Sequence, residues 1–195
     1  LSCGGRELSI ASPLIGRYNV CNLALAASVA GTLEIPGQVI QGALAQCGGA
    51  PGRLQSIRSP RGFTVYVDYA HTDDALRNVL EALRELDPRE LTVVFGCGGD
   101  RDRSKRPRMG RMAAAFADRV YVTSDNPRSE QPEAIIEEIL DGIPCGVNVD
   151  TVVDRHEAIQ AAVYGAGAGD IILVAGKGHE DYQEIAGERF HFDDL

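Results

Sequence analysis

The sequence has no apolar run close to the roughly 18 residues that a membrane-spanning helix needs, and we expect no N-terminal signal peptide. It is also short of basic residues, since 19 Lys and Arg stand against 28 Asp and Glu, a formal net charge of −9 at pH 7. Non-specific nucleic-acid binding needs a basic surface that displaces counterions. We therefore expect neither a membrane nor a nucleic-acid partner.

Paired cysteines, metal-ligand spacings and internal repeats are absent as well. The five cysteines are scattered singly, an odd count typical of reduced thiols in a cytoplasmic protein: Cys3, Cys21, Cys47, Cys97 and Cys145. The four histidines show no spacing that specifies a metal, and no nucleophile–base arrangement stands out. We expect no metal site and no catalytic residue of that kind within this chain.

What the sequence does contain is a regular alternation of short apolar runs and helical patterns from residue 63 onward. Five runs suit buried strands: 63–67, 91–95, 120–123, 147–149 and 171–175. Helical spacing lies between them at 76–86, 109–116, 135–140 and 158–163. Such alternation needs crossover connections, so it predicts an α/β fold with a mostly parallel sheet covered on both faces.

Residues 1–52 do not read as an independent domain. Helical spacing runs from Val20 to Ala27, and a second short helix is predicted at 39–44. Two helices alone leave their apolar faces exposed to water, so we expect another part of the protein to complete their core. The glycine-rich segment 48–52 indicates a hinge or linker, and a chain that opens with Leu1 rather than Met leads us to expect its natural start upstream.

Unusual polar motifs follow four of the five predicted strands. They occupy 68–71, 96–102, 124–128 and 176–181. In open α/β sheets, ligands bind in the crevice beyond the carboxyl ends of the strands. A purely structural domain needs only short turns there, so this edge is predicted to be a site.

Two of these motifs have competing interpretations. The glycines of 96–99 lack the third glycine of a dinucleotide-binding loop, and no helix pattern follows at once. The basic run within 100–108 suits a solvated loop, but its position beside the site favours a positive patch for phosphate or carboxylate. Asp68 can cap a turn or bind a ribose hydroxyl, and His71 can be a helix-entry residue or a site residue; the residues alone leave both questions open.

The other two motifs point to an amino acid. Asn126 and Pro127 suit a simple turn, but Pro127 can also stiffen a loop in which Arg128 presents its planar fork to a carboxylate. The run 176–178 is not a P-loop, because Lys177 is followed by glycine. Glu180, just beyond it, can pair with a substrate ammonium group.

Together these motifs resemble the Mur ligases. The resemblance rests on Asp-Tyr-Ala-His-Thr (68–72), Gly-Cys-Gly-Gly-Asp-Arg-Asp (96–102), Lys-Arg-Pro (105–107), Asp-Asn-Pro-Arg (125–128) and Gly-Lys-Gly-His-Glu-Asp-Tyr (176–182), with Gly-Arg-Tyr-Asn-Val-Cys-Asn (16–22) and Pro-Gly-Arg-Leu (51–54) upstream. It implies that 1–52 is the tail of a central ATPase domain and that 53–195 is a Rossmann-like C-terminal domain whose last helix is expected beyond Leu195.

The motif set is most similar to the family members that add meso-diaminopimelate to UDP-N-acetylmuramoyl-L-alanyl-D-glutamate in peptidoglycan precursor synthesis. The resemblance implies a diaminopimelate site at Arg106, Asn126, Pro127, Arg128, Gly176 and Glu180, and ATP contacts at Asn19, Arg53, Asp68, Tyr69 and His71. It implies ATP and Mg²⁺ bound mainly by the central domain, an acyl phosphate formed on the glutamyl carboxylate, and a fragment that is inactive alone.

The sequence also departs from the family pattern and leaves rivals. Asp73 stands where the family usually has proline, and Gln55 replaces a frequent glutamate. A lysine-adding or folylpolyglutamate-type ligase is disfavoured by Arg128 and the Gly-His-Glu-Asp loop. A non-catalytic Rossmann-like binding module remains an alternative, whereas the missing third glycine argues against an NAD-dependent oxidoreductase.

Overall fold

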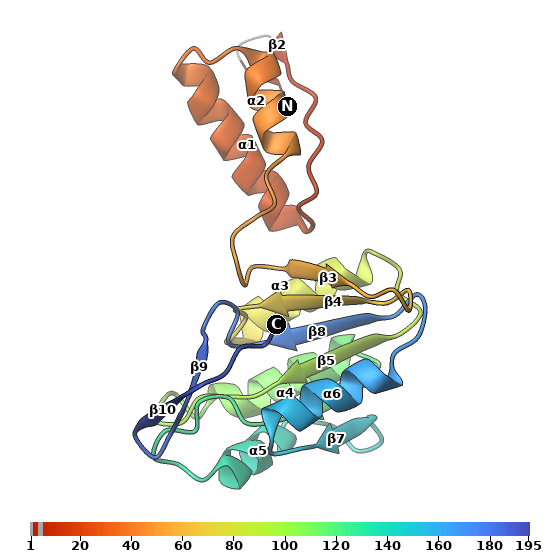
Figure 1. The fold of residues 1–195 in the computed structure, drawn as a ribbon, viewed down its shortest axis with the longest axis vertical. Helices are drawn as coiled ribbons and strands as arrows, with labels where there is room; N and C mark the ends of the chain where they lie inside the picture. The colour runs from red at the N-terminus through yellow and green to blue at the C-terminus, as the bar shows by residue number, and fades with distance from the viewer. Residues whose placement is uncertain (1, 4–5) are drawn as a thin grey trace. The chain divides into compact units, whose positions relative to one another are not determined.

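The computed structural model describes residues 2–3 and 6–195 and divides into two compact units, Leu1–Ala50 and Pro51–Leu195 (Figure 1). No helix in the described part of the chain is long and apolar enough to cross a membrane. Cys21, Cys47, Cys97 and Cys145 are free thiols, as expected, while the side chain of Cys3 lies outside the described residues.

The smaller unit consists of two helices and a short antiparallel pair of strands. These elements are β1 (Ser2–Cys3), β2 (Arg6–Glu7), α1 (Arg17–Thr32) and α2 (Gly37–Ala45). Each helix buries one residue, Ala27 in α1 and Ile40 in α2. Large apolar side chains stay exposed on both helices: Val20, Leu25, Val29 and Val39. As the sequence predicts, the two helices do not enclose their own core.

The larger unit is built on a six-stranded sheet with the order β3-β4-β8-β5-β6-β7. The strands are β3 (Gln55–Arg58), β4 (Thr64–Asp68), β5 (Leu91–Phe95), β6 (Arg119–Val122), β7 (Val149–Thr151) and β8 (Ile171–Ala175). All neighbours pair parallel except the edge strand β3, which is antiparallel to β4. The prediction of a mostly parallel α/β sheet is confirmed.

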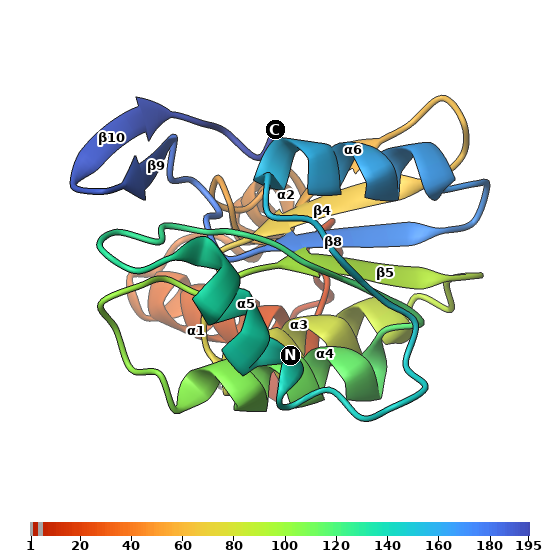
Figure 2. The same ribbon diagram turned by 90° about the horizontal axis from the view of Figure 1, so that it is seen from below.

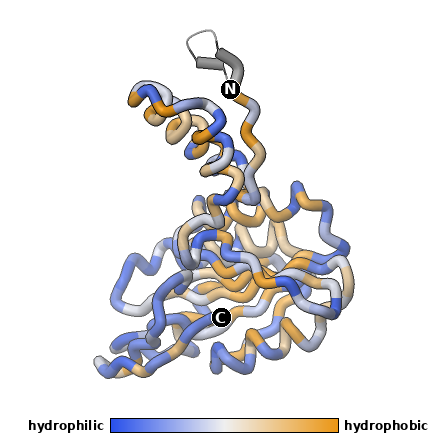
Figure 3. The backbone as a smooth tube through the Cα atoms, turned by 45° about the horizontal axis from the view of Figure 1, so that its top comes forward, coloured by the Kyte–Doolittle hydropathy of each residue, from blue (hydrophilic) through white to orange (hydrophobic). Residues whose placement is uncertain are grey.

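Helices cover both faces of this sheet. Seen from below, α6 (Arg155–Gly165) lies on one face, and α3 (Asp73–Arg84), α4 (Lys105–Phe116) and α5 (Pro132–Leu140) lie on the other (Figure 2). The central strands β5 and β8 are buried at every position, and hydrophobic residues gather along the middle of the sheet (Figure 3). Burial on both faces explains why these two strands read as uninterrupted apolar runs.

Several elements differ from the sequence prediction. Strand β3 was not expected, because an edge strand with only Ile57 as a large apolar residue carries little hydrophobic signal. The hairpin of β9 (Tyr182–Ile185) and β10 (Glu188–His191) was also missed, since β10 is exposed throughout. Helix α3 begins at Asp73, ahead of its apolar face, because the Thr72 hydroxyl caps it by accepting a 3.2 Å hydrogen bond from the Ala75 N–H.

Candidate functional site at the carboxyl edge of the sheet

The polar motifs meet at one edge because the strands that precede them end level. Asp68 and Phe95 both lie opposite Ala175 in the parallel register, and Phe95 also lies opposite Val122. The arrowheads of β4, β8 and β5 accordingly point to the same side of the sheet (Figure 1). The loops after β4, β5, β6 and β8 therefore leave from a common edge, as the sequence predicts.

Glu180 is the meeting point of two of these loops. Its half-buried carboxylate accepts a 3.2 Å hydrogen bond from the Tyr69 hydroxyl and a 3.1 Å bond from the Asn126 side-chain amide. Burial, together with the Glu180 charge, raises the pKa of the Tyr69 phenol. The tyrosine stays a donor at neutral pH, so the Glu180 carboxylate is held between two neutral donors.

Lys177 lies beneath this group and was not predicted as a site residue. Its side chain is fully buried, and its ammonium donates to the Asn126 side-chain oxygen at 2.9 Å and to the Tyr182 carbonyl at 2.7 Å. An Asp125 carboxylate oxygen lies 3.4 Å away. Burial lowers the pKa of Lys177. The one available signal was a lysine between two glycines directly after a fully apolar strand.

Gly176 is required by the space around it. Its φ is +121°, and a Cβ there would lie 2.8 Å from a carboxylate oxygen of Asp125. A side chain at this position would push against the buried Asp125–Lys177 pair. The glycine thus lets β8 end directly against the loop that carries Asn126.

Arg128 occupies a left-handed backbone conformation, with φ of 53°, which is uncommon for a non-glycine residue. Its side chain is 19% exposed, and the Nη1 atom donates to the Gly99 carbonyl at 2.8 Å. A Cβ on Gly98 would lie 2.8 Å from this Nη1, so glycine makes room for the guanidinium. Pro127 is buried, and its carbonyl accepts the Glu130 N–H at 3.0 Å.

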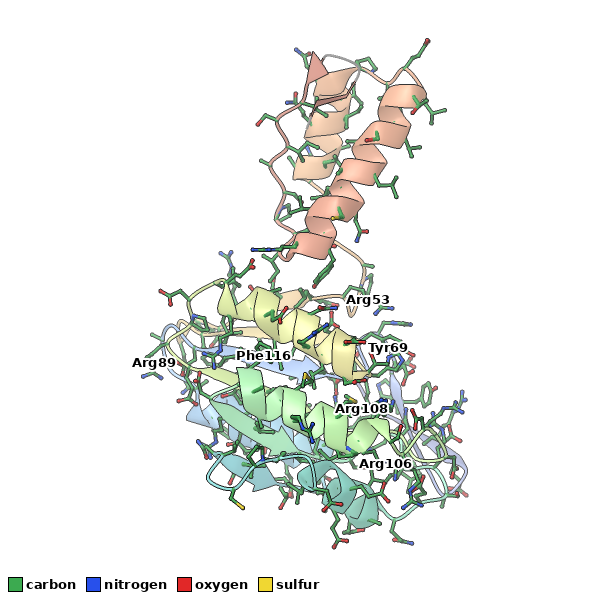
Figure 4. The ribbon with its side chains drawn as sticks, turned by 180° about the vertical axis from the view of Figure 1, so that it is seen from behind. Arg53, Tyr69, Arg89, Arg106, Arg108 and Phe116 are labelled. Atoms are coloured by element: carbon green, nitrogen blue, oxygen red, sulfur yellow. The ribbon has the colours of Figure 1, made fainter. Side chains whose placement is uncertain are left out.

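Arg106, at the start of α4, is fully buried, and its guanidinium is engaged by the protein's own carboxylates (Figure 4). Nη1 donates to Glu130 and Glu138, each at 2.9 Å, and Nη2 donates to Glu130 at 2.8 Å. A buried guanidinium must be paired, because an unpaired charge is costly to desolvate. Arg103 also pairs with Glu138, and Arg108 with Asp73, so the basic run is largely neutralised instead of forming the free positive patch expected from sequence.

Acidification is expected to weaken the Arg106 network as Glu130 becomes protonated. The Arg106 hydrogen bonds lower the pKa of Glu130 from 4.5 to about 2. A depressed carboxyl pKa stabilises the fold above the unfolded value, and this contribution is lost as the pH falls from 4.5 toward 2. Glu130→Gln should lower the free energy of unfolding at neutral pH by about 1 kcal/mol after solvent screening, and should make stability fall less steeply between about pH 4.5 and 2. Urea midpoints at neutral pH and down to about pH 2.5 measure both effects. If stability fell as steeply in acid as in the wild type, the Arg106–Glu130 pair would not be the cause.

Asp68 uses both carboxylate oxygens on the backbone. One accepts the Leu54 N–H and the other the Ala70 N–H, each at 2.8 Å. Burial raises the pKa of Asp68, and these two N–H groups oppose the rise. The turn-capping role is therefore present in the structure, and it ties the chain before β3 to the end of β4. A ribose hydroxyl would have to share these oxygens.

The other residues expected to contact a nucleotide fall in two places. Arg53 is exposed, with its guanidinium carbon 4.8 Å from the Tyr69 ring centroid, and both side chains project from the larger unit in Figure 4. His71 is also exposed, and its Nδ1 lies 2.9 Å from the Tyr69 carbonyl. Asn19 belongs to the smaller unit, where its amide donates to the Ile15 carbonyl at 2.8 Å at the start of α1.

The 96–102 loop and the 124–128 loop are in backbone contact at Gly99. A Cβ on Gly99 would lie 1.9 Å from the Pro127 carbonyl oxygen, a backbone atom that cannot move without shifting Arg128. Gly99→Ala is expected to destabilise the larger unit by about 1–3 kcal/mol, as overpacking does. Chemical denaturation checks this, with Gly165→Ala as the matched control because its Cβ meets nothing within 4 Å. Equal stability of the two variants would contradict the close packing of these loops.

Comparisons with known proteins find relatives over nearly the whole length of the chain. A family model described as the Mur ligase, glutamate ligase domain matches residues 52–178. The UDP-N-acetylmuramoyl-L-alanyl-D-glutamate–2,6-diaminopimelate ligase of Gloeobacter violaceus is 51% identical over 184 residues, covering 94% of this chain. The protein of the same name from Chlorobaculum tepidum is 51% identical over 193 residues, covering 97% of this chain. The chain spans 38% of the length of each relative.

The chain also superposes on solved ligase structures. A structure of a UDP-N-acetylmuramoyl-L-alanyl-D-glutamate–2,6-diaminopimelate ligase superposes with a TM-score of 0.75 at 47% identity, covering 95% of this chain and 38% of that one. A Mycobacterium tuberculosis folylpolyglutamate synthase complexed with ADP and AMPPCP superposes with a TM-score of 0.66 at 26% identity, covering 86% and 39% of the two chains.

Proposed function

Because the chain belongs to the Mur ligase family through its glutamate ligase domain, we propose that it forms the C-terminal part of an ATP-dependent ligase. The proposed enzyme adds meso-diaminopimelate to UDP-N-acetylmuramoyl-L-alanyl-D-glutamate in the cytoplasm, during peptidoglycan precursor synthesis. Relatives about half identical to the chain carry that name. The observation that carries the proposal is the placement of Asn126, Arg128 and Glu180 at one edge of the sheet.

These three side chains suit an amino acid with charged groups at both ends. Arg128, whose side chain is 19% exposed, offers its guanidinium to the carboxylate that diaminopimelate has and lysine lacks. Glu180 offers a carboxylate, already held by two donors, to an ammonium group. Gly176, also proposed to line the acceptor site, leaves room for the Asp125 carboxylate beside this loop, and Pro127 fixes the loop between Asn126 and Arg128.

Arg106 is proposed to act on the acceptor site through the loops. Its guanidinium holds Glu130, which in turn accepts the Asp100 N–H at 2.7 Å. It thereby fixes the 96–102 loop, whose Gly99 carbonyl binds Arg128. Nη1 and Nη2 of Arg106 are occupied by the two glutamates and the Gly98 carbonyl, and Nε is buried, so a direct bond to diaminopimelate would require the site to rearrange.

Some of the residues expected to contact ATP suit its phosphate groups. Arg53 and His71 are exposed and carry donors suited to phosphate oxygens, with Tyr69 and Asp68 fixing the segment around them. Asn19 is proposed to contribute from the smaller unit, the tail of the central domain. Within the described residues no group of three or more His, Cys, Asp or Glu could hold a metal, so Mg²⁺ is proposed to bind the part of the ligase that this chain does not include.

The chain's contribution to the reaction is to place the attacking amine. ATP supplies the activation of the glutamyl carboxylate as an acyl phosphate. Arg128 and Glu180 fix the distal end of the acceptor, so that its reacting amino group is aimed at the activated carbonyl. Fixing the orientation of two reactants in this way can lower a barrier by several kcal/mol. The chain alone is expected to be inactive.

The test is ATP-dependent phosphate release by the full-length ligase with UDP-N-acetylmuramoyl-L-alanyl-D-glutamate and either meso-diaminopimelate or L-lysine. Strong selectivity for diaminopimelate is expected. Preference for lysine would retain a ligase but overturn the role given to Arg128. If a folded enzyme released no phosphate with either acceptor, the non-catalytic binding module would be the better description.

A further inference from the structure

The hairpin formed by β9 and β10 is attached to the Asp125–Arg128 loop and was not identified by any sequence motif. The Gln183 side-chain amide donates to the Asp125 carbonyl at 2.7 Å, and the Glu184 N–H donates to the Asn126 side-chain oxygen at 2.9 Å. β10 is exposed at every position, and the hairpin forms a separate two-stranded sheet (Figure 2). Its contacts with this loop therefore fix it in place.

The hairpin also holds the backbone of Arg128. The Arg128 N–H donates to the Glu184 carbonyl at 3.0 Å, and the Arg128 carbonyl accepts the Ala186 N–H at 2.7 Å. A left-handed conformation at a non-glycine residue persists only where the surroundings impose it. These two bonds impose it, and they set the direction in which the arginine side chain leaves the loop.

Glu184 reaches the Arg128 side chain as well. Its carboxylate lies 3.6 Å from Arg128 Nε, while the Gly99 carbonyl accepts a hydrogen bond from Nη1. Both side chains are mostly buried, 19% and 24% exposed, so solvent screens this pair less than a surface pair. The guanidinium thus has an ion-pair partner at Nε and a hydrogen-bond acceptor at Nη1, and together they restrict its orientation.

Glu184 further determines how Asn126 is oriented. Two donors, the Glu184 N–H and the Lys177 ammonium, converge on the Asn126 side-chain oxygen. The amide nitrogen must then face Glu180. One residue of the hairpin therefore acts on both Asn126 and Arg128, the two loop residues proposed to meet the acceptor.

We propose that Glu184 is a positioning residue for acceptor specificity: it orients the Arg128 guanidinium toward the distal carboxylate of the amino acid. This inference rests on the proposed function, because it concerns the same acceptor site. The β9–β10 hairpin would therefore hold the Asp125–Arg128 loop in the conformation that binds the acceptor. The substrate contact stays with Arg128, and Glu184 acts through it.

The test compares Glu184→Gln with the wild-type full-length ligase in the phosphate-release assay. The glutamine keeps the backbone bonds and the side-chain shape but removes the charge. The KM for meso-diaminopimelate is expected to rise about five- to tenfold with kcat nearly unchanged, as the loss of one coupling would produce. Activity with L-lysine should not change. Glu188→Gln, an exposed glutamate in the same hairpin, is the matched control and should behave as wild type.

A double-mutant cycle separates positioning from a purely structural role. In an Arg128→Ala background, Glu184→Gln should have no further effect on the KM, because the group through which it acts is gone. An unchanged KM in the single variant, or a full effect in the Arg128→Ala background, would overturn the inference while the wild type still uses diaminopimelate. A wild type that does not use diaminopimelate would instead overturn the proposed function, and the inference with it.

Discussion

Arg128→Ala in the full-length ligase is expected to raise the KM for meso-diaminopimelate about 10- to 100-fold, the range that corresponds to losing one charge-assisted hydrogen bond. The guanidinium is the group at this edge that suits the second carboxylate of the acceptor, and it is already oriented by Gly99 and Glu184. Alanine leaves that carboxylate without its partner. Steady-state kinetics with varied diaminopimelate measures the effect.

The controls for this prediction separate charge from geometry. Arg128→Lys keeps the positive charge but loses the planar fork, so it should recover only part of the affinity. Arg111→Ala, an exposed arginine within α4, should leave the KM unchanged. The weak activity expected with L-lysine should not fall in Arg128→Ala, because lysine has no second carboxylate. A KM for diaminopimelate equal to that of the wild type would reject Arg128 as the specificity residue.

Arg155→Met is expected to destabilise the larger unit by about 3–5 kcal/mol, the usual cost of removing one partner from a buried ion pair. The Arg155 and Asp194 side chains are both fully buried. Nε and Nη2 of the arginine each donate to one carboxylate oxygen at 2.7 Å, and Nη2 also donates to the Ala175 carbonyl at 3.1 Å. Methionine leaves the Asp194 charge in the interior with no compensating cation, and it frees the end of β8.

Urea denaturation of the chain measures this loss against a total stability that is typically about 5–15 kcal/mol for a domain. The double variant Arg155→Met with Asp194→Leu should be markedly more stable than Arg155→Met, because no charge is left buried. If the single variant were within about 1 kcal/mol of the wild type, the pair would have to be solvated in solution. The same experiment tests whether Asp194 anchors the end of the described chain.

Much of the fold followed from local sequence. Strands β5 and β8 match the predicted residues, because strands buried on both faces must be apolar throughout. The common edge followed too, since parallel strands in a sheet deliver their carboxyl-terminal loops to one side. β3 and the β9–β10 hairpin did not, because half-exposed strands need few apolar residues and are held by pairing with other segments.

The assignment of roles within the site is where sequence reached its limit. Arg106 and Arg128 are the same residue type, one near the start of α4 and the other in the loop after β6. In the structure Arg106 is fully buried against Glu130 and Glu138, whereas the Arg128 side chain is 19% exposed. The carboxylates that reach Arg106 lie 24 and 32 positions away in the sequence, and Glu184 is farther still from Arg128, so no local pattern encodes these pairings. The contacts of the site residues with diaminopimelate and with ATP remain predictions.

The sequence by itself determined the family, the parallel sheet and the edge at which the polar loops gather, because hydrophobic periodicity and short motifs are local properties of the chain. Only the tertiary structure decided that Lys177 is buried beneath Asn126, that Asp68 caps the start of the larger unit, and that Glu184 of the hairpin faces Arg128. These pairings join segments far apart in the chain. They are set by burial, since a charge removed from water is stable only where the fold brings it a partner.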